Sequence, residues 1–316
     1  MKRLLIGGLL VGGGFGLSAA GQQTVFRTKG DVVPVFVTVT DRDGRLVTDL
    51  DRDAFEVRDD GKPQPITQFD NSPQPIRLVV MLDVSGSMEG NLQLLRDASL
   101  QLFIRLRADD VARVGTFGRE VTISETFTNN PTTLRAGLPE TIAPDAPTPL
   151  WRALDTAMEA FGDETDKRLV VLVLSDGKDS GFERARFGER PPSQAETIDR
   201  ARRDDVMIYA VGMHSRSSRR AAPGLGAGGL RATLVDDLPD PGLARVAEET
   251  GGGYIELRGA DDLGAAFAQV ANELHSQYLL GYATPKRDGK THDISVRLDE
   301  RGLKARARKS YVAPRS

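Results

Sequence analysis

The stretch Leu78-Val79-Val80-Met81-Leu82-Asp83-Val84-Ser85-Gly86-Ser87 is the most informative part of the chain for its fold. Five apolar residues in a row, bounded by a turn signal, are typical of a strand that is buried on both faces of a parallel sheet. A carboxylate and two hydroxyls follow at the carboxyl end of this strand, where open α/β sheets bind ligands. Such oxygen donors favour Mg²⁺, Mn²⁺ or Ca²⁺ over zinc.

Residues 76–276 alternate between predicted strands and predicted helices. Helical spacing of apolar residues predicts helices at 92–106, 150–161, 195–203, 242–250 and 260–274. Between them, apolar runs predict further strands at 112–117, 121–127, 169–174, 206–211 and 254–257. This alternation predicts a doubly wound, mostly parallel α/β sheet with right-handed crossovers.

The two flanks, residues 24–75 and 277–314, have a β pattern. In the first flank, apolar residues alternate at 33–39, and turn signals stand at Asp43-Gly44 and Asp60-Gly61. In the second flank, the pattern predicts short strands at 278–282, 292–298 and 303–311. Neither flank completes a sheet alone, so we expect both to form one β-sandwich into which the α/β domain is inserted. Two separate β modules are the alternative. In the last strand, Lys304, Arg306 and Arg308 alternate with alanines, which predicts a solvated face rather than a site for an anionic envelope polymer.

Composition excludes several kinds of function. The chain has 316 residues with a net charge of −3, which gives no sign of a nucleic-acid partner. It has no cysteine, so disulfides, thiolate metal sites and cysteine nucleophiles are excluded.

The first 20 residues predict a secretory signal peptide. Lys2-Arg3 precedes an apolar, glycine-rich stretch that ends in the small residues Ser18-Ala19-Ala20. We therefore expect an exported protein, periplasmic or extracellular. The alternative is that the segment stays uncleaved and anchors the chain in a membrane.

A second carboxylate joins Asp83 in the predicted sheet. The apolar strand at 169–174 ends in Ser175-Asp176-Gly177, and parallel strands bring their carboxyl ends to the same edge. Thr148 stands just before the helix at 150–161, where it is a natural N-cap. Asp-x-Ser-x-Ser alone is a weak motif, since aspartate and serine also favour turns and caps. The second strand-end aspartate makes coincidence less credible.

These motifs and the order of elements resemble the von Willebrand factor A-domain family over residues 76–276. The resemblance implies that five side chains hold one divalent cation, Mg²⁺ or alternatively Mn²⁺ or Ca²⁺. They are Asp83, Ser85, Ser87, Thr148 and Asp176. It also implies that a Glu or Asp carboxylate of a protein partner completes the coordination. Ala146-Pro147 stands where the family often has Gly-Gly. The flanking segments 53–62 and 278–282 are similar to those of exported bacterial proteins that carry such a domain.

We therefore expect a metal-dependent binding or adhesion module and not an enzyme, with loops 87–90, 144–151 and 178–192 around the metal face. A metal-dependent hydrolase is one alternative, but Ser85 lacks the Gly-x-Ser-x-Gly frame, and the three histidines show no ligand spacing. A structural domain with an idle site is the other. The glycine-rich segment 215–229 predicts a loop and not a phosphate cradle, because no Gly-Lys-Ser/Thr follows it. Trp151, in the first turn of a helix, is expected to be buried.

Overall fold

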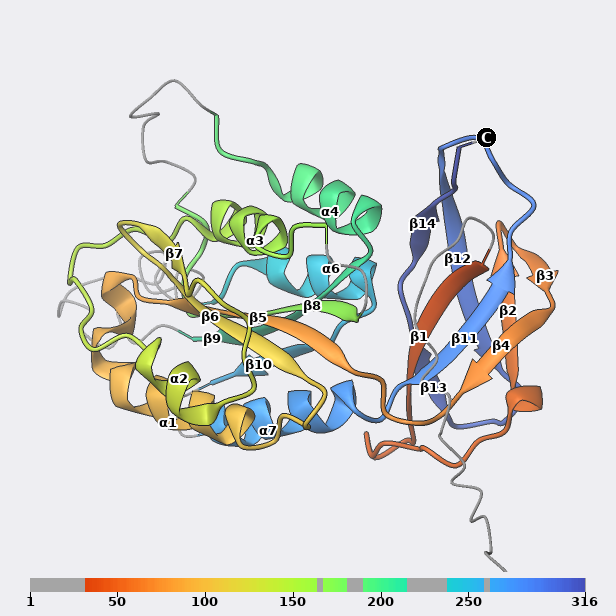
Figure 1. The fold of residues 1–316 in the computed structure, drawn as a ribbon, viewed down its shortest axis with the longest axis horizontal. Coiled ribbons are helices and arrows are strands. Elements are labelled where there is room, and N and C mark those ends of the chain that lie inside the picture. Colours follow the sequence, from red (N-terminus) through yellow and green to blue (C-terminus); the bar gives the residue numbers. More distant parts are fainter. Residues whose placement is uncertain (1–31, 164–166, 181–189, 215–237, 259–261, 316) are drawn as a thin grey trace, which may run out of the picture.

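A computed structural model describes residues 32–163, 167–180, 190–214, 238–258 and 262–315. An α/β lobe and an all-β lobe lie side by side (Figure 1). The predicted signal peptide and the glycine-rich segment 215–229 lie outside the described residues.

The α/β lobe is built on a six-stranded sheet. Its strands are parallel except for the edge strand β7, which confirms the predicted doubly wound sheet. From one edge to the other they are β10 (Tyr254–Leu257), β9 (Val206–Met213), β8 (Arg168–Ser175), β5 (Ile76–Asp83), β6 (Val111–Phe117) and β7 (Val121–Ile123). The chain leaves β5 toward β6 and later returns to β8 on its other side. The strand order therefore reverses between β5 and β8, which is where open α/β sheets bind ligands.

Helices cover both faces of this sheet (Figure 1). One face packs against α1 (Leu92–Phe103), α2 (Pro131–Ala136) and α7 (Leu263–Leu274). The other packs against α3 (Leu150–Glu159), α4 (Gln194–Arg203) and α6 (Pro241–Thr250). Burial on both faces explains why the central strands are apolar throughout. Gly251 ends α6 in a left-handed conformation, as its position predicts.

The all-β lobe is a sandwich of two four-stranded sheets, to which both flanks of the chain contribute. Their strand orders are β13-β1-β11-β4 and β14-β12-β2-β3. The N-terminal strands are β1 (Val32–Thr40), β2 (Phe55–Asp59), β3 (Lys62–Gln64) and β4 (Ile66–Asp70); the C-terminal ones are β11 (Tyr278–Ala283), β12 (Thr291–Leu298), β13 (Lys304–Arg306) and β14 (Ser310–Val312). Because β11 lies between β1 and β4, and β12 lies beside β2, the predicted insertion into one sandwich is confirmed.

The predicted last strand at 303–311 is wrong in one respect. The chain breaks after Arg306, so that β13 joins one sheet of the sandwich and β14 joins the other. The expected solvated face is confirmed for Lys304, which is exposed, but is wrong for the two arginines: Arg306 pairs with Glu273 of α7, and Arg308 pairs with Asp205. Both arginines face the α/β lobe, which a strand pattern considered alone could not reveal.

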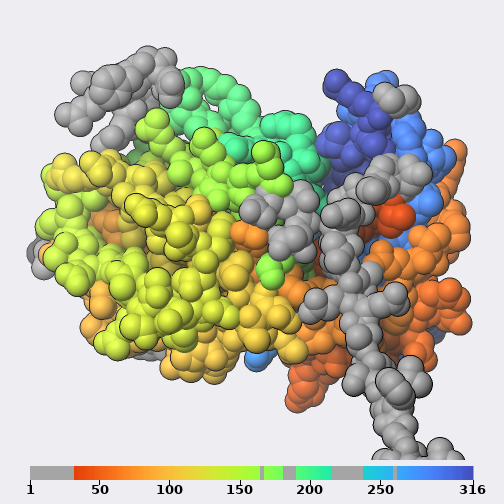
Figure 2. Space-filling model, viewed as in Figure 1, coloured from red at the N-terminus to blue at the C-terminus, as the bar shows by residue number. Residues whose placement is uncertain are grey.

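The two lobes meet along a seam in which α4 contacts β14. Figure 2 shows the green surface of the α4 region next to the dark blue C-terminal strand. Two short 3-10 helices, η1 (Arg52–Ala54) and η2 (Gly86–Asn91), complete the fold. In the part of the chain that the structure describes, no helix has both the length and the apolar character needed to cross a bilayer.

Candidate metal centre

Asp83 and Asp176 lie at the carboxyl ends of two adjacent strands. Asp83 is the last residue of β5, and Asp176 directly follows β8. The two strands pair in parallel up to Leu82 and Leu174, so both aspartates reach the same edge of the sheet. Their side chains are buried, with 0% and 1% exposure. The sheet therefore places two carboxylates at the point where the strand order reverses.

A chain of short contacts joins these aspartates through the two serines. The Ser85 backbone N–H donates to Oδ1 of Asp83 over 2.8 Å. The Ser85 and Ser87 hydroxyls are 3.1 Å apart, and Ser87 Oγ donates to Oδ1 of Asp176 over 2.7 Å. Ser85 is buried, whereas Ser87 is exposed. The cluster thus has an opening to solvent at Ser87.

Gly86 lets a second loop pack against this turn. A Cβ added at Gly86 would lie 1.9 Å from the Pro144 carbonyl oxygen, so only glycine fits. The Gly86 N–H donates to the Ala146 carbonyl over 3.1 Å. These contacts bring the segment that leads into Thr148 against residues 83–87.

Thr148 is buried beside Asp176. A Cβ on Gly177, the residue after Asp176, would lie 3.0 Å from the Thr148 hydroxyl oxygen. All five predicted residues are therefore close together. The prediction that Thr148 caps α3 is wrong: Pro149 is the N-cap residue, and the Leu150 N–H donates to Oδ1 of Asp179. The Thr148 hydroxyl lies against Gly177 instead.

Asp179 and Ser180 support this loop, and the sequence reasoning missed both. Ser180 Oγ accepts a 3.0 Å hydrogen bond from the Thr148 N–H, while the Ser180 N–H donates to the Thr148 carbonyl. The Asp179 carboxylate takes over the capping of α3 at 2.9 Å. The only sequence signal is that two polar residues follow Asp176-Gly177 at short range.

The electrostatics of the site favour a cation. Burial and the nearby charge of Asp176 raise the pKa of Asp83 to about 7, against hydrogen bonds from Ser175 and Ser85. Burial likewise raises the pKa of Asp176. Oδ2 of Asp176 is buried without a hydrogen-bond partner. Among the described residues, no lysine or arginine contributes to the pKa shift of either carboxylate. Two carboxylates and three hydroxyls form a hard oxygen donor set, which fits Mg²⁺, Mn²⁺ or Ca²⁺.

The histidines are all engaged elsewhere. His214 contacts Glu256, and His275 contacts the buried Asp110, each over 2.8 Å. His292, on strand β12, lies in the sandwich beside Asp59 and Asp60. Nothing in the described residues therefore gives Ser85 or Ser87 a histidine base.

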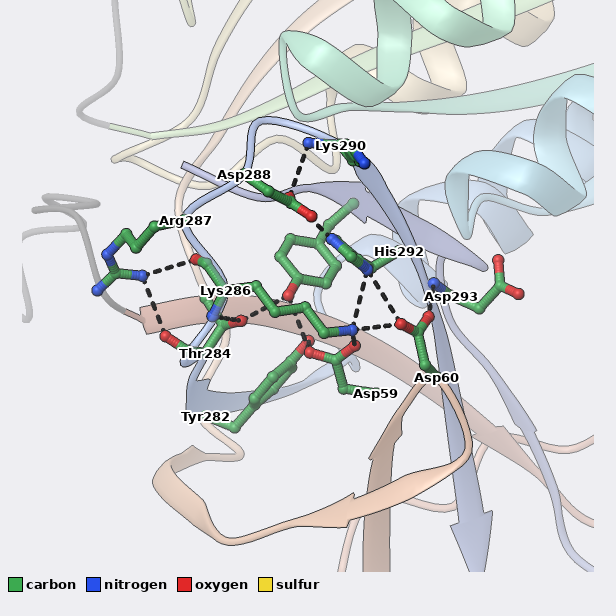
Figure 3. Close-up of polar contacts among 11 residues, drawn as sticks. Asp59, Asp60, Tyr282, Thr284, Lys286, Arg287, Asp288, Lys290, His292 and Asp293 are labelled. Carbon is green, nitrogen blue, oxygen red and sulfur yellow. Dashed lines mark hydrogen bonds and ion pairs between the residues drawn. The ribbon is translucent and has the colours of Figure 1, made fainter. Parts of the chain in front are cut away.

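Asp59, Asp60 and His292 form a second group whose ligand atoms lie within 4.8 Å of one another. Figure 3 shows that the Lys286 ammonium points into this group. Lys286 Nζ is 2.6 Å from Oδ1 of Asp59 and 2.9 Å from Nδ1 of His292, and it also pairs with Asp60. The hydroxyls of Tyr282 and Tyr311 donate to the other oxygen of Asp59 over 3.2 and 2.8 Å. This group therefore already contains a cation, supplied by the chain.

The chain is similar to one protein family and to several proteins of known structure. Residues 78–178 match the family model of the von Willebrand factor type A domain. No curated protein sequence matches the chain significantly. A solved von Willebrand factor type A structure from Catenulispora acidiphila is similar at 11% identity, covering 92% of this chain and 76% of that one with a TM-score of 0.49. Others are BatB from Bacteroides thetaiotaomicron (15% identity, 63% and 98% coverage, TM-score 0.45) and proximal thread matrix protein 1 from the mussel byssus.

The mussel protein was solved with a zinc-occupied MIDAS motif. It is 17% identical, with a TM-score of 0.47 over 69% of this chain, and this chain spans half of its length. The family match begins in β5 and ends after Asp176, so it contains both strand-end aspartates and the loops between them. The part of the α/β lobe from β5 to just after β8 therefore matches the von Willebrand factor type A domain family.

Proposed function

We propose that this protein is a metal-dependent binding module, in which Asp83, Ser85, Ser87, Thr148 and Asp176 hold one Mg²⁺, Mn²⁺ or Ca²⁺ ion. The observation that carries the proposal is the environment of Asp176. One of its oxygens binds the Ser87 hydroxyl at 2.7 Å, while the other is buried without a partner. An unpartnered buried carboxylate oxygen is costly unless a ligand satisfies it.

Each residue has a role that its position supports. Asp83 and Asp176 provide negative charge, while Ser85, Ser87 and Thr148 provide neutral oxygens. When bound, the ion supplies residual positive charge and an exchangeable coordination position. Ser87 is exposed, so a Glu or Asp carboxylate of a protein partner can approach from solvent at that point. An acidic envelope polymer offers the same group.

Export of the protein belongs to the same proposal. The basic, apolar and small-residue parts of residues 1–20 support secretion into the periplasm or beyond. Binding would then occur outside the cytoplasm, or at a membrane surface where the segment is not cleaved. A pulse-chase comparison of precursor and mature mass in the producing cell tests this part.

Titration calorimetry with Mg²⁺, Mn²⁺ and Ca²⁺ tests the metal site. We expect one ion per wild-type chain and no measurable binding for Asp83→Ala or Asp176→Ala. Asp145→Ala is the matched control, because Asp145 is an exposed aspartate on the adjoining loop and should leave binding intact. Unchanged metal affinity in Asp176→Ala would refute the assignment of the site.

The partner is tested with the full chain as bait for envelope proteins. Capture should occur with Mg²⁺, disappear with EDTA, and be absent for Asp176→Ala. A captured protein should then lose binding when one of its surface Glu or Asp residues is replaced by the corresponding amide. Capture that survives both EDTA and the Asp176 substitution would refute binding through the metal face.

A further inference from the structure

A small cavity lies in the seam between the α/β lobe and the sandwich. Its volume is about 20 Å³, room for one particle of about the size of a water molecule. Its wall includes Arg168 of β8, Arg202 of α4, Arg308 of the β13–β14 connection and Ser310 of β14. Both lobes therefore contribute polar side chains to one enclosed space.

These four side chains carry buried donors that have no acceptor. They are Nε of Arg168, Nε of Arg202, Nε of Arg308 and the hydroxyl of Ser310. Among the described residues, nine buried side-chain polar atoms lack a partner, so this one wall accounts for four of them. Arg168 and Ser310 are only 6% and 5% exposed. Leaving so many buried donors unsatisfied is costly, which indicates an acceptor in the cavity.

The charges of the wall show which acceptor is suitable. The terminal nitrogens of Arg202 pair with Asp199 and Glu249, and those of Arg308 bind Asp205 and the Pro34 carbonyl. Arg168 differs, because its terminal nitrogens bind only neutral acceptors, the Gln277 side chain and the Leu274 carbonyl.

Arg168 is consequently the one cation of the described wall without a carboxylate bonded to it. Arg202 and Arg308 are each paired with an acidic side chain. The guanidinium of Arg168 also lies over the ring of Phe36, 4.7 Å from its centroid. Burial lowers the pKa of Arg168 to about 10, although the nearby Tyr209 and Asp110 oppose this shift.

We propose that this cavity binds one monatomic monovalent anion of the chloride class, held by Arg168, Arg202, Arg308 and Ser310. A water molecule has two lone pairs and can accept from two of the four donors, whereas a halide can accept from all of them. A halide also balances the charge of Arg168, and the small volume favours a monatomic anion. Since the donors come from both lobes, the anion fastens the sandwich to the α/β domain.

The anion has a route from solvent. A larger adjoining cavity of about 250 Å³ shares Arg202, Asp205 and Arg308 with the small one. Its other walls belong to β1, β14 and the turn at Thr284. We therefore expect the anion to exchange through this larger cavity.

Thermal unfolding of the full chain in EDTA tests the proposal independently of the metal site. At constant ionic strength, gluconate, which is too large for the cavity, is replaced stepwise by chloride or bromide. We expect a saturable rise in Tm of about 2 °C or more, because a ligand that binds only the folded state stabilises it. A bromide-soaked crystal should show an anomalous peak within the cavity.

Three variants sharpen the test. Ser310→Ala removes one donor without changing charge and should reduce the chloride-dependent rise, while Arg168→Gln should abolish it. Arg301→Gln removes the same charge from an exposed site and should retain the full rise. Equal Tm values in gluconate, chloride and bromide, or an ordered water without bromide signal in the cavity, would overturn the proposal. If Arg168→Gln does not fold, Ser310→Ala and the bromide crystal still decide the question.

Discussion

This protein has two pairs of neighbouring aspartates, Asp59 with Asp60 in the sandwich and Asp83 with Asp176 in the α/β domain. The two pairs differ in whether the chain itself supplies a cation to offset their negative charge. In the sandwich, Lys286 places its ammonium between the carboxylates. In the α/β domain, the two carboxylates meet serine hydroxyls, and one oxygen has no partner. A tethered ammonium closes the first cluster to other cations, whereas the second stays available to a cation from solution. The difference therefore separates a structural ion network from the site that we propose binds a metal ion.

Replacing an aspartate by asparagine should have opposite effects in the two clusters, and this is the largest effect that we expect. Asp59→Asn leaves the Lys286 ammonium without its buried partner and should lower the free energy of unfolding by about 3 kcal/mol. Asp83→Asn removes a buried charge that Asp176 repels, so the metal-free protein should be at least as stable as wild type while metal no longer stabilises it.

Urea unfolding of both variants, with EDTA and with Mg²⁺, measures these two effects. Asp299→Asn, at an exposed aspartate, serves as the control and should change little. If both substitutions destabilise the metal-free protein equally, the two clusters are alike and the comparison fails.

Removing the tethered ammonium should turn the sandwich cluster into a metal site. Lys286→Met leaves Asp59, Asp60 and His292 with their ligand atoms close together and without a cation. The variant should lose about 2 kcal/mol of stability in EDTA and recover part of it with Zn²⁺, which suits a mixed histidine and carboxylate set. Differential scanning calorimetry measures both changes. Lys290→Met, in the same loop, should show neither, and the absence of a zinc effect in Lys286→Met would contradict the prediction.

Removing the hydrogen bond that supports Thr148 should have a smaller effect, which is limited to metal binding. Ser180→Ala removes the acceptor of the Thr148 N–H, a loss of about 1 kcal/mol that corresponds to roughly fivefold weaker metal binding. The sandwich should be unaffected, because Ser180 belongs to the other lobe. Calorimetric titration with Mn²⁺ measures the affinity, and Ser180→Thr, which keeps the hydroxyl, should restore most of it. Equal affinities in all three proteins would show that this hydrogen bond does not position Thr148.

The pH dependence of the sandwich network should be the smallest effect. The Lys286 hydrogen bond lowers the pKa of Asp60, and the His292 hydrogen bond lowers that of Asp288. Burial lowers the pKa of His292, but its hydrogen bonds to Asp288 and Asp60 outweigh burial, so the pKa is raised overall. The aspartates therefore stabilise the fold above their ordinary pKa of 3.8 and lose that contribution as the pH falls. Protonated His292 stabilises it below 6.5 and loses that contribution as the pH rises.

The contribution of this network to the free energy of unfolding, measured in urea, should accordingly be highest between pH 3.8 and pH 6.5. His292→Asn should flatten the decline on the alkaline side without changing the acid side. A decline of equal slope in this variant would show that another group is responsible.

Much of the fold, and the closeness of Asp83 to Asp176, was predictable because short-range patterns determine them. Apolar runs such as 78–82 and 169–174 require burial on both faces, and parallel strands then bring Asp83 and Asp176 to one edge. Thr148 was identified by resemblance, but its local role was not. The sequence favours Thr148 as the N-cap of α3. In the structure, the Asp179 carboxylate accepts the hydrogen bond from the first N–H of α3, that of Leu150, which lies 29 positions away in the chain.

Features that depend on contacts between distant segments were not predictable. Lys286 meets Asp59 across 227 positions, and neither residue lies in a recognisable motif. Arg306 and Arg308 followed a strand pattern that ended at an unexpected break, so their partners in α7 and beside β9 could not be foreseen. In both cases the pairing follows from how the sandwich closes around the inserted domain.

The insertion also determines how a mechanical load would travel through the molecule. The chain enters the α/β domain at Ile76 and leaves it after Leu274, both beside the sandwich, while Asp83 lies at the far end of β5, about 23 Å away. A partner that pulls at the metal face therefore strains β5 along its axis. Its hydrogen bonds to β6 and β8 then resist together in shear rather than opening one by one, an arrangement suited to holding a tethered object under tension.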